Sequence, residues 1–380
     1  MDTLVVDSIG KVDRRSWDEL VGNDNFFNSH QWLSSLERTR GEAPVLLATS
    51  QGAVTGGVAT WRGTGDEPGA LVTPLKFRAD LPGPWRHEVL WLGARRPVFN
   101  DLLCTGGPGR RETMAALLDR ARVVAYDSGL GAVVMPYTPL STALELAGAR
   151  PDVSVVLHSA DATIAVPPAG AGPQFAGARH KDRKEWRREQ RIFQSEGNVA
   201  KWFPMTEDVV AEIVPLIAQT RERYGSKTDS ESLVEFFTAQ RTAGLLDGAV
   251  ACVCERDGRT VAGAVFYRYR DELYGLFVGF GYEHVGRGFQ YFTLVFYEAV
   301  AWAQEHGVRR YRLAFSSYAA KVARGASLRP LAAVVLPAAE PPADPALIDA
   351  HNTAMTSWFR DRFGHRTQAL TDDWALVGQA

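Results

Sequence analysis

Residues 273–290 read LYGLFVGFGYEHVGRGFQ, and this stretch decides the fold. Leu273 to Phe280 is an apolar and aromatic run typical of a buried strand. The glycine turn Gly286-Arg287-Gly288 follows, and Phe289 to His306 has the pattern of a helix. Arg310 to Phe315 is again strand-like. Strand, glycine turn, helix and strand in this order predict an α/β domain with a mixed sheet.

The segments before this stretch extend the same domain. The turns Arg256-Asp257-Gly258 and Arg270-Asp271-Glu272 join strand-like runs into a meander. A strongly basic helix opens the domain, and two further helices precede the meander. The expected elements are helices at Lys181–Ser195, Val209–Tyr224 and Ser230–Ala243, and strands at Val199–Phe203, Ala249–Cys254 and Val261–Tyr269.

The first half of the chain repeats this order with little residue identity. A hairpin at 44–61 precedes the glycine turn Thr105–Arg111, a helix at Glu112–Asp127 and a strand at Gly131–Tyr137. The Pro- and Gly-rich run Val166–Pro173 can form neither a helix nor a strand interior. We therefore expect two lobes in tandem, the second better preserved. The expected division is 1–166, 174–337 and a C-terminal helix and tail at 338–380.

The composition narrows the function classes. The 380 residues are 46% hydrophobic, and 42 Lys+Arg balance 44 Asp+Glu, which argues against a protein that coats nucleic acid. Cys104, Cys252 and Cys254 have the spacing of neither a disulfide framework nor a zinc site, so we expect no metal and a cytoplasmic location. The start lacks the pattern of a signal peptide, and no run of 18 apolar residues spans a membrane.

The turn Gly286-Arg287-Gly288 is a candidate anion site. The first N–H groups of the helix that follows have no partner within it, and the dipole adds roughly 0.3–1 kcal/mol. Glycines allow a phosphate to approach the backbone, and Arg287 adds a charged contact. The alternative is a strand–helix turn that uses glycine for packing, and G-x-G by itself fits both interpretations equally well.

Leu273 to Gln290, with the helix and strand after it, resembles the central strand and pyrophosphate loop of the GNAT acyltransferase superfamily. The loop pattern there is Q/R-x-x-G-x-G/A: Gly286 and Gly288 match the small positions, while Glu283 replaces Gln or Arg. The stretches 305–311 and 321–325 are similar to the tandem-lobed FemAB-like branch. The resemblance implies an acyl donor on phosphopantetheine, as co-substrate rather than bound cofactor. It also implies that backbone N–H groups of Phe277, Val278 and Gly279 hold the thioester carbonyl.

A substrate amine as nucleophile requires a base for its proton and an acid for the departing thiolate. Glu283 and His284, at the end of the central strand, are the candidate bases, although a solvated loop pair explains them as well. For the acid we choose Tyr318, which follows the last strand where the superfamily often places a tyrosine; the alternative is a packing aromatic.

Two further residues near Tyr318 are candidates for substrate contact. Ser316 either contacts substrate or caps a turn, and Lys321 faces the donor or acceptor unless it is a surface lysine. Glu272 and Asp271 are interpreted as turn residues.

Residues 179–191, which include the start of the basic helix, hold seven cations. The candidate docking residues of this helix are Arg183, Lys184, Arg187 and Arg188. They suit a polyanion such as an acidic acyl carrier protein, a phosphorylated acceptor or, less well, a tRNA. The alternative is a solvated helix in which Glu185 and Glu189 pair with cations of the same helix.

These features leave three interpretations open. The first is an N-acyltransferase that moves an acyl group from coenzyme A or a carrier protein to a small-molecule or peptide amine, for example in specialised-metabolite biosynthesis. The second is a FemAB-type ligase that uses aminoacyl-tRNA. The third is a non-catalytic module that binds an acyl ligand or a partner. None of the three interpretations involves DNA or a membrane span.

Overall fold

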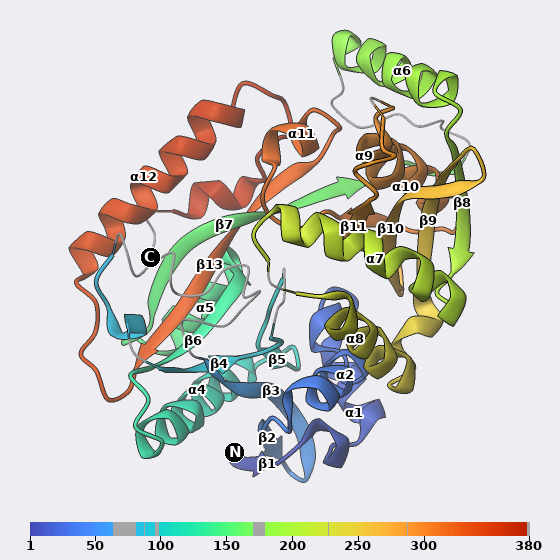
Figure 1. The fold of residues 1–380 in the computed structure, drawn as a ribbon. Helices are drawn as coiled ribbons and strands as arrows, with labels where there is room; N and C mark the ends of the chain where they lie inside the picture. Colours follow the sequence, from blue (N-terminus) through green and yellow to red (C-terminus); the bar gives the residue numbers. More distant parts are fainter. Residues whose placement is uncertain are drawn as a thin grey trace. The chain divides into compact units, whose positions relative to one another are not determined.

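The computed structural model describes residues 1–63, 81–86, 88–95, 99–169, 179–226, 228–286 and 288–377. The chain forms two compact units, whose elements are labelled in Figure 1. Unit 1 comprises 1–161, 329–365 and 370–380; unit 2 comprises 162–328 and 366–369. The division thus differs from the expected one, because most of 338–380 belongs to the same unit as the N-terminal half.

Unit 1 is a sheet with helices on both faces. Its strands are β1 (Asp2–Val6), β2 (Val45–Ser50), β3 (Ala53–Gly63), β4 (Val89–Leu92), β5 (Leu103–Cys104) and β6 (Ala132–Pro139), with most of β7 (Ser154–Ala165) and β13 (Ser327–Pro337). Its α-helices are α1 (Arg14–Val21), α2 (His30–Arg40), α4 (Arg110–Asp127), α5 (Leu140–Ala149) and α12 (Pro345–Phe363). Four 3-10 turns are η1 (Ile9–Lys11), η2 (Phe26–Asn28), η3 (Pro84–Arg86) and η6 (Asp372–Leu376).

The strands of unit 1 run in the order β1, β2, β3, β4, β6 and β13. Neighbours are antiparallel except β4 and β6, which pair in parallel across the connection that contains α4. One core, with Leu46, Met114 and Leu146, lies under α4 and α5. A second, with Trp85, Val134 and Ile348, lies under α12 on the other side.

Unit 2 contains the expected meander. Its strands are β8 (Val199–Pro204), β9 (Ala249–Arg256), β10 (Arg259–Tyr269), β11 (Glu272–Phe280) and β12 (Arg310–Arg312). Its helices are α6 (His180–Ser195), α7 (Glu207–Arg223), α8 (Ser230–Thr242), the 3-10 turn η4 (Leu245–Gly248), α9 (Gln290–Phe292), the π-helical η5 (Thr293–Glu298), α10 (Ala299–Glu305) and α11 (Tyr318–Val322).

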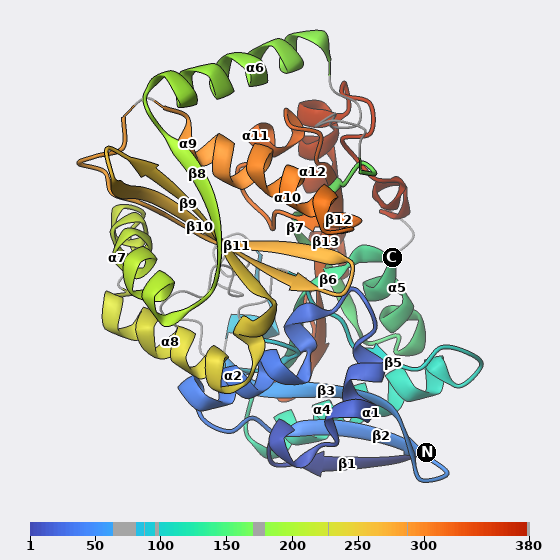
Figure 2. The same cartoon turned by 90° about the vertical axis from the view of Figure 1, so that its right-hand side faces the viewer.

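The strands of unit 2 are ordered β12, β11, β10, β9 and β8, and residues 163–165 of β7 pair with β12. β11 and β12 are parallel, whereas the meander is antiparallel. Helices α7 and α8 cover one face, and the run from α9 through η5 to α10 covers the other (Figure 2). On the first face Gly263 lets Ile213 of α7 approach, and on the second the rings of Trp202 and Trp302 stack.

Side-chain caps fix where several helices begin. Thr206 and Asp229 accept hydrogen bonds from the N–H groups three residues on, at the starts of α7 and α8. Ser29 does the same for α2. None of the helices in the described ranges is long and apolar enough to cross a membrane.

Candidate active site

The sheet of unit 2 opens where β11 and β12 part. Their parallel register covers residues 272–274 of β11 and 310–312 of β12. β12 ends at Arg312, so the strand expected to reach Phe315 is shorter than predicted. β11 continues to Phe280, and its residues 275–278 are half-buried, in contrast to the fully buried 272–274. Past Tyr274, β11 therefore has an open edge.

A β-bulge lies at the start of this open edge. Val265 of β10 pairs with Phe277, whereas the next residue, Phe266, pairs with Gly275. Leu276 is the extra residue of β11. A bulge bends its strand and changes the alternation of backbone groups, so the pairing beyond it must be read separately.

Beyond the bulge, alternate N–H groups of β11 point to opposite sides. The Gly281 N–H donates to the Val261 carbonyl of β10 at 2.9 Å. The Phe280 N–H instead donates to Thr220 Oγ1 of α7, also at 2.9 Å. Because backbone direction alternates along a strand, the N–H of Val278 points away from β10, toward the open edge.

Phe277 and Gly279 therefore differ from Val278, although we expected all three to hold a thioester carbonyl. Their N–H groups point to β10 by the same alternation. A Cβ on Gly279 would lie 2.5 Å from the carbonyl carbon of Leu216, so this glycine admits the backbone of α7. The Phe277 ring packs 5.3 Å from that of Phe237 on α8. Phe277 and Gly279 thus pack against α8 and α7 and form the wall of the open edge, whereas the N–H of Val278 faces that edge.

The glycines of the expected phosphate turn are packed against side chains. A Cβ on Gly288 would lie 2.5 Å from Asn198 Nδ2 and 2.8 Å from Gln290 Nε2. A Cβ on Gly286 would lie 2.8 Å from Arg256 Nη1. Both positions thus have a packing reason to be glycine that is independent of any ligand.

Arg256, at the end of β9, brings a positive charge to this turn, which the sequence did not reveal. Its guanidinium donates to the carbonyl of His284. Arg287, the cation expected here, lies outside the described residues. Phe289 ends the turn at φ 55°, a left-handed conformation, and the helical run starts at Gln290. The turn lies between strand and helix, as predicted.

The candidate acid and bases lie at the same end of the sheet. Glu283 and His284 are exposed in the turn after β11, and Tyr318 is the half-buried first residue of α11, after β12. Because β11 and β12 are parallel, both segments follow carboxyl ends that share one edge. Glu283, His284 and Tyr318 therefore all follow the same edge of the sheet in unit 2.

Lys321 organises the turn that leads to Tyr318. It is 4% exposed, and its Nζ donates to the carbonyls of residues 313–315 at 2.6, 3.0 and 2.8 Å. Ala314, Ser316 and Ser317 have φ values of 60°, 68° and 48°, a costly conformation for residues with a Cβ. Lys321 is thus no surface lysine; it holds a strained turn on which Ser316 is exposed.

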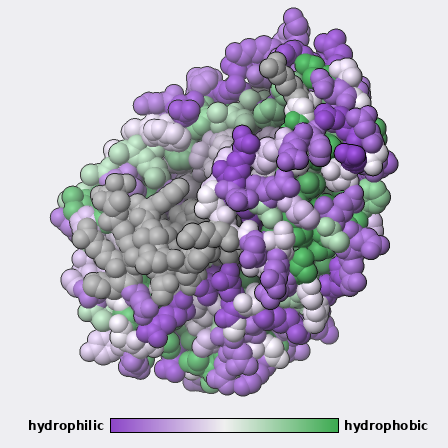
Figure 3. Space-filling model, in the orientation of Figure 1, coloured by the Kyte–Doolittle hydropathy of each residue, from purple (hydrophilic) through white to green (hydrophobic). Residues whose placement is uncertain are grey.

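The basic helix α6 carries its cations on the outside. Figure 3 shows a hydrophilic surface over it. A groove of about 710 Å³ runs along the helix. Of the expected docking residues, Arg183, Lys184 and Arg187 line the groove, whereas Arg188 pairs with Glu185 at 2.7 Å. The groove is lined by His180, Arg183, Lys184, Arg187, Gln190, Arg191 and Gln194.

Glu189 corrects one expectation for this helix. It is buried and pairs with Arg324, far along the chain, instead of with a cation of α6. Tyr297 of η5 also donates to its carboxylate. Glu189 therefore anchors α6 to the rest of unit 2. Its charge is paired with Arg324 and does not neutralise the exposed cations of α6.

Glu272, interpreted from the sequence as a turn residue, is fully buried. Its carboxylate accepts from Arg312 Nε at 2.7 Å and from the Tyr274 hydroxyl at 2.5 Å, and it pairs with Arg310 at 2.5 Å. These groups lie where β11 and β12 pair, just before the open edge. Glu272 is therefore not a turn residue: its contacts with Arg310 and Arg312 hold β11 and β12 together just before the two strands separate.

Asp101 in unit 1 is a titratable group that the sequence did not single out. Burial raises its pKa to about 7, against the opposing effect of Arg110. Arg110 begins α4 and pairs with Glu145 at 2.8 Å. The glycine turn Thr105–Arg111 precedes this helix, as the repeated order predicts.

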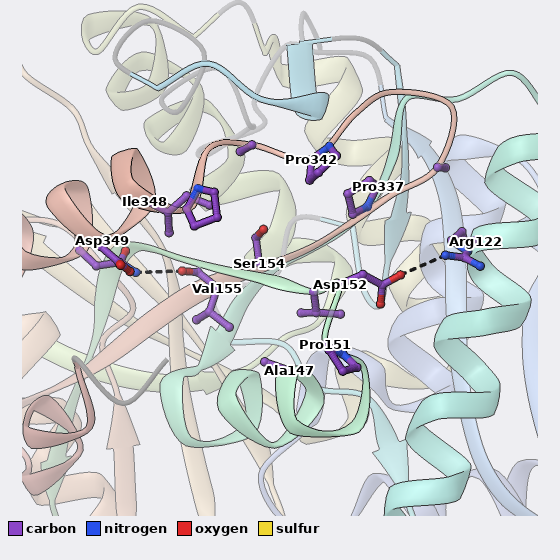
Figure 4. A pocket seen from close by; sticks show the side chains of 15 residues that line it. Arg122, Ala147, Pro151, Asp152, Ser154, Val155, Pro337, Pro342, Ile348 and Asp349 are labelled. Carbon is purple, nitrogen blue, oxygen red and sulfur yellow. Dashed lines mark hydrogen bonds and ion pairs between the residues drawn. The ribbon is translucent and has the colours of Figure 1, made fainter.

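A cavity of about 630 Å³ lies in unit 1, away from every candidate residue (Figure 4). Pro337, Pro342 and Ile348 form apolar walls, and Arg122 pairs with Asp152 at its rim at 3.0 Å. Across the described ranges, no three His, Cys, Asp or Glu side chains are grouped to hold a metal ion.

Comparison with known proteins identifies the domain. Residues 180–321 match the model of the acetyltransferase (GNAT) domain. No curated protein matches the sequence. Among solved structures, FemX superposes with a TM-score of 0.60 at 12% identity, over 89% of this chain and 98% of that chain.

Two further structures agree. The C-terminal domain of an Agrobacterium fabrum protein described as a lysylphosphatidylglycerol synthetase gives 0.55 at 10% identity, over 93% and 97% of the chains. A tandem GNAT protein from the clavulanic acid biosynthesis pathway gives 0.51 at 14%, over 90% and 99%. At these identities the likeness is one of fold. The chain therefore has the tandem GNAT, FemAB-like fold, mixed α/β in two lobes, and residues 180–321 match the acetyltransferase (GNAT) domain.

Proposed function

We propose that the protein is an N-acyltransferase that moves an acyl group from a phosphopantetheine thioester to an amine. One observation carries the proposal: β11 parts from β12 after Tyr274, and the Val278 N–H faces the open edge. A pantetheine arm laid along this edge would place its thioester carbonyl at that donor. The N–H would then stabilise the oxyanion of the tetrahedral intermediate.

The donor's phosphates would lie at the turn after β11. Arg256 supplies a cation there, and the helical run starting at Gln290 supplies free N–H groups. The tandem GNAT structure from the clavulanic acid pathway is described as lacking acetyl-CoA, which makes coenzyme A a natural first donor to test.

Transfer would proceed by direct attack of the amine. The nitrogen forms a bond to the carbonyl carbon, Glu283 or His284 takes the ammonium proton, and the carbon–sulfur bond breaks. Tyr318 protonates the departing thiolate. Burial raises the pKa of Cys104 and of Cys254 to about 12, so neither thiol is ionised at neutral pH and an acyl-cysteine route is disfavoured.

The test uses the full chain, coenzyme A and a panel of amines with acetyl-CoA. We expect calorimetry to detect coenzyme A binding and a thiol reagent to detect its release. Tyr318→Phe should keep binding and lose turnover about 10- to 100-fold, whereas Tyr224→Phe, at a side chain 81% exposed, should change neither. Absence of both binding and release would overturn the proposal.

A second candidate is aminoacyl transfer from tRNA, because the α6 groove presents cations without an opposing face of carboxylates. Polyanion binding there would weaken steeply with salt. RNase treatment separates the candidates: it would abolish transfer from aminoacyl-tRNA and leave transfer from acetyl-CoA unchanged. Lys184→Glu and Arg187→Glu should impair the tRNA reaction alone.

A further inference from the structure

Arg221, in the last turn of α7, lies against the wall of the open edge. Its guanidinium carbon is 5.3 Å from the centre of the Phe277 ring. Burial lowers the pKa of this guanidinium, and Tyr267 acts in the opposite direction. No carboxylate in the described part of the chain forms an ion pair with Arg221.

Folding alone explains Arg221 poorly. A cation at a helix C-terminus gains a little from the helix dipole, and contact with an aromatic ring adds a similarly small amount. Arg223 obtains both, with its guanidinium carbon 4.3 Å from the Tyr282 ring, and it stays exposed. Arg221 is half-buried instead, and burying a charge without a partner costs more than such contacts return.

Tyr267, whose hydroxyl acts electrostatically on Arg221, is hydrogen-bonded to a buried amide side chain. Gln240 is fully buried, and its Oε1 accepts from the Tyr267 hydroxyl at 2.7 Å. Its Nε2 has no hydrogen-bond partner among the residues described. The guanidinium stacked on Phe277 keeps its edge of N–H groups for a planar anion. The donors of this cluster therefore suit an anion.

The position of the cluster indicates which molecule brings that anion. Phe277 immediately precedes Val278, the proposed oxyanion donor, and its ring faces α7 and α8, with Phe236 and Phe237 at 5.9 and 5.3 Å. An acceptor bound on the side of the sheet that α7 and α8 cover would lie close to the thioester, because Phe277 and Val278 are neighbours in β11. A nearby guanidinium would also favour the neutral, nucleophilic form of the amine.

We propose that Arg221 binds a carboxylate of the acceptor, so that the acceptors are amino acids or peptides with a free carboxylate near the amine. This assignment rests on the proposed acyl transfer. It makes Arg221 a specificity-determining residue and gives the acceptor a fixed orientation: carboxylate at Arg221, apolar portion against the phenylalanines, amine toward Val278.

The test measures binding without turnover. N-acetyl amino acids, which represent the product, are titrated in parallel with their carboxamides, in the presence of coenzyme A. We expect the full chain to bind the carboxylates about 10- to 100-fold more tightly than the amides. Arg221→Met, which keeps an unbranched side chain but removes the guanidinium, should abolish this ratio, and Arg223→Met is the matched control that should keep it.

The outcomes separate the two proposals. Equal binding of acids and amides, no binding by any member of the panel, or a ratio that survives Arg221→Met would each overturn the carboxylate site. Release of thiol from acetyl-CoA without a preference for acids would leave acyl transfer standing while this assignment fails. A carboxylate preference without coenzyme A binding or thiol release would leave the carboxylate site standing while the proposed acyl transfer fails. Thermal unfolding of each variant confirms that it is folded.

Discussion

Glu189 and Arg324 form a bidentate ion pair inside unit 2, with Nη2 of the arginine 2.6 and 2.8 Å from the two carboxylate oxygens. The same guanidinium lies 3.6 Å from the centre of the Phe292 ring. The pair joins the basic helix α6 to the segment after α11, and through Phe292 of α9 and Tyr297 of η5 it also contacts the helical run behind the glycine turn. It therefore links the surface proposed for docking to the segment proposed to hold the donor.

Breaking this pair should be costly. Arg324→Met leaves the Glu189 carboxylate buried without its partner, which is expected to lower the free energy of unfolding by about 3–5 kcal/mol. The double variant Glu189→Leu, Arg324→Met should recover much of the loss. Urea unfolding measures both. A single variant as stable as the wild type would show that the pair contributes nothing.

Gly279→Ala tests the contact between β11 and α7. The added methyl would meet backbone atoms of Leu216 and Ile217, which cannot swing aside. We expect a destabilisation of about 1–3 kcal/mol or more. Gly106→Ala serves as the control, because open space surrounds that glycine. Equal melting temperatures for the two variants would contradict the close approach.

The two glycines of the turn should respond differently to alanine. At Gly288 the methyl would collide with the buried, hydrogen-bonded pair Asn198 and Gln290, which predicts a loss of about 1–3 kcal/mol in unfolding free energy. At Gly286 it would meet the far end of Arg256, which can move, so stability should change little. Calorimetric titration with coenzyme A then reports whether either glycine also serves the donor.

Asp101 should make stability fall as pH rises. Its pKa is about 7 in the folded protein and near 3.8 when unfolded, so the native state binds the extra proton between these values. The contribution of Asp101 to the free energy of unfolding is then greatest below about pH 4 and declines toward pH 7, by up to about 1.4 kcal/mol per pH unit. Asp101→Asn should remove that component. Denaturant titrations between pH 4 and 8 measure it, and identical profiles for both proteins would refute the shift.

Lys321→Met should disturb the turn at 313–317. The substitution leaves three carbonyls without their donor beside residues in a left-handed conformation. We expect about 1–3 kcal/mol of destabilisation and a lower kcat, because Tyr318 follows the turn. An unchanged kcat in a folded variant would separate the turn from catalysis.

Much of the fold follows from local pattern. The meander and the helices α6, α7 and α8 begin and end within a few residues of their predicted bounds, because turns and caps with strong preferences delimit them. Among the missed elements are α5, β7 and β13. The first is an alanine- and leucine-rich run without a capping side chain, and the other two are long strands whose partners lie far away in sequence.

The site was predictable as a region but not in its contacts. The glycine turn and the residues around it were chosen because the sequence shows a strand, a glycine turn, a helix and a strand in that order. The burial of Glu272, the long-range partner of Glu189 and the role of Arg256 depend on tertiary neighbours that no local spacing encodes. The bulge at Leu276 also shifts the alternation of β11, so a simple period of two assigns Val278 wrongly.

The three hydrogen bonds that Lys321 donates to backbone carbonyls also have a consequence for self-acylation, in which an acyltransferase modifies its own lysines. An amine close to an activated acyl group is a competitor for the true acceptor. An ammonium whose protons are all directed at backbone oxygens has no lone pair to attack with, and its burial keeps the thioester away. Lys321 is thereby excluded from autoacylation by the same contacts that shape the turn.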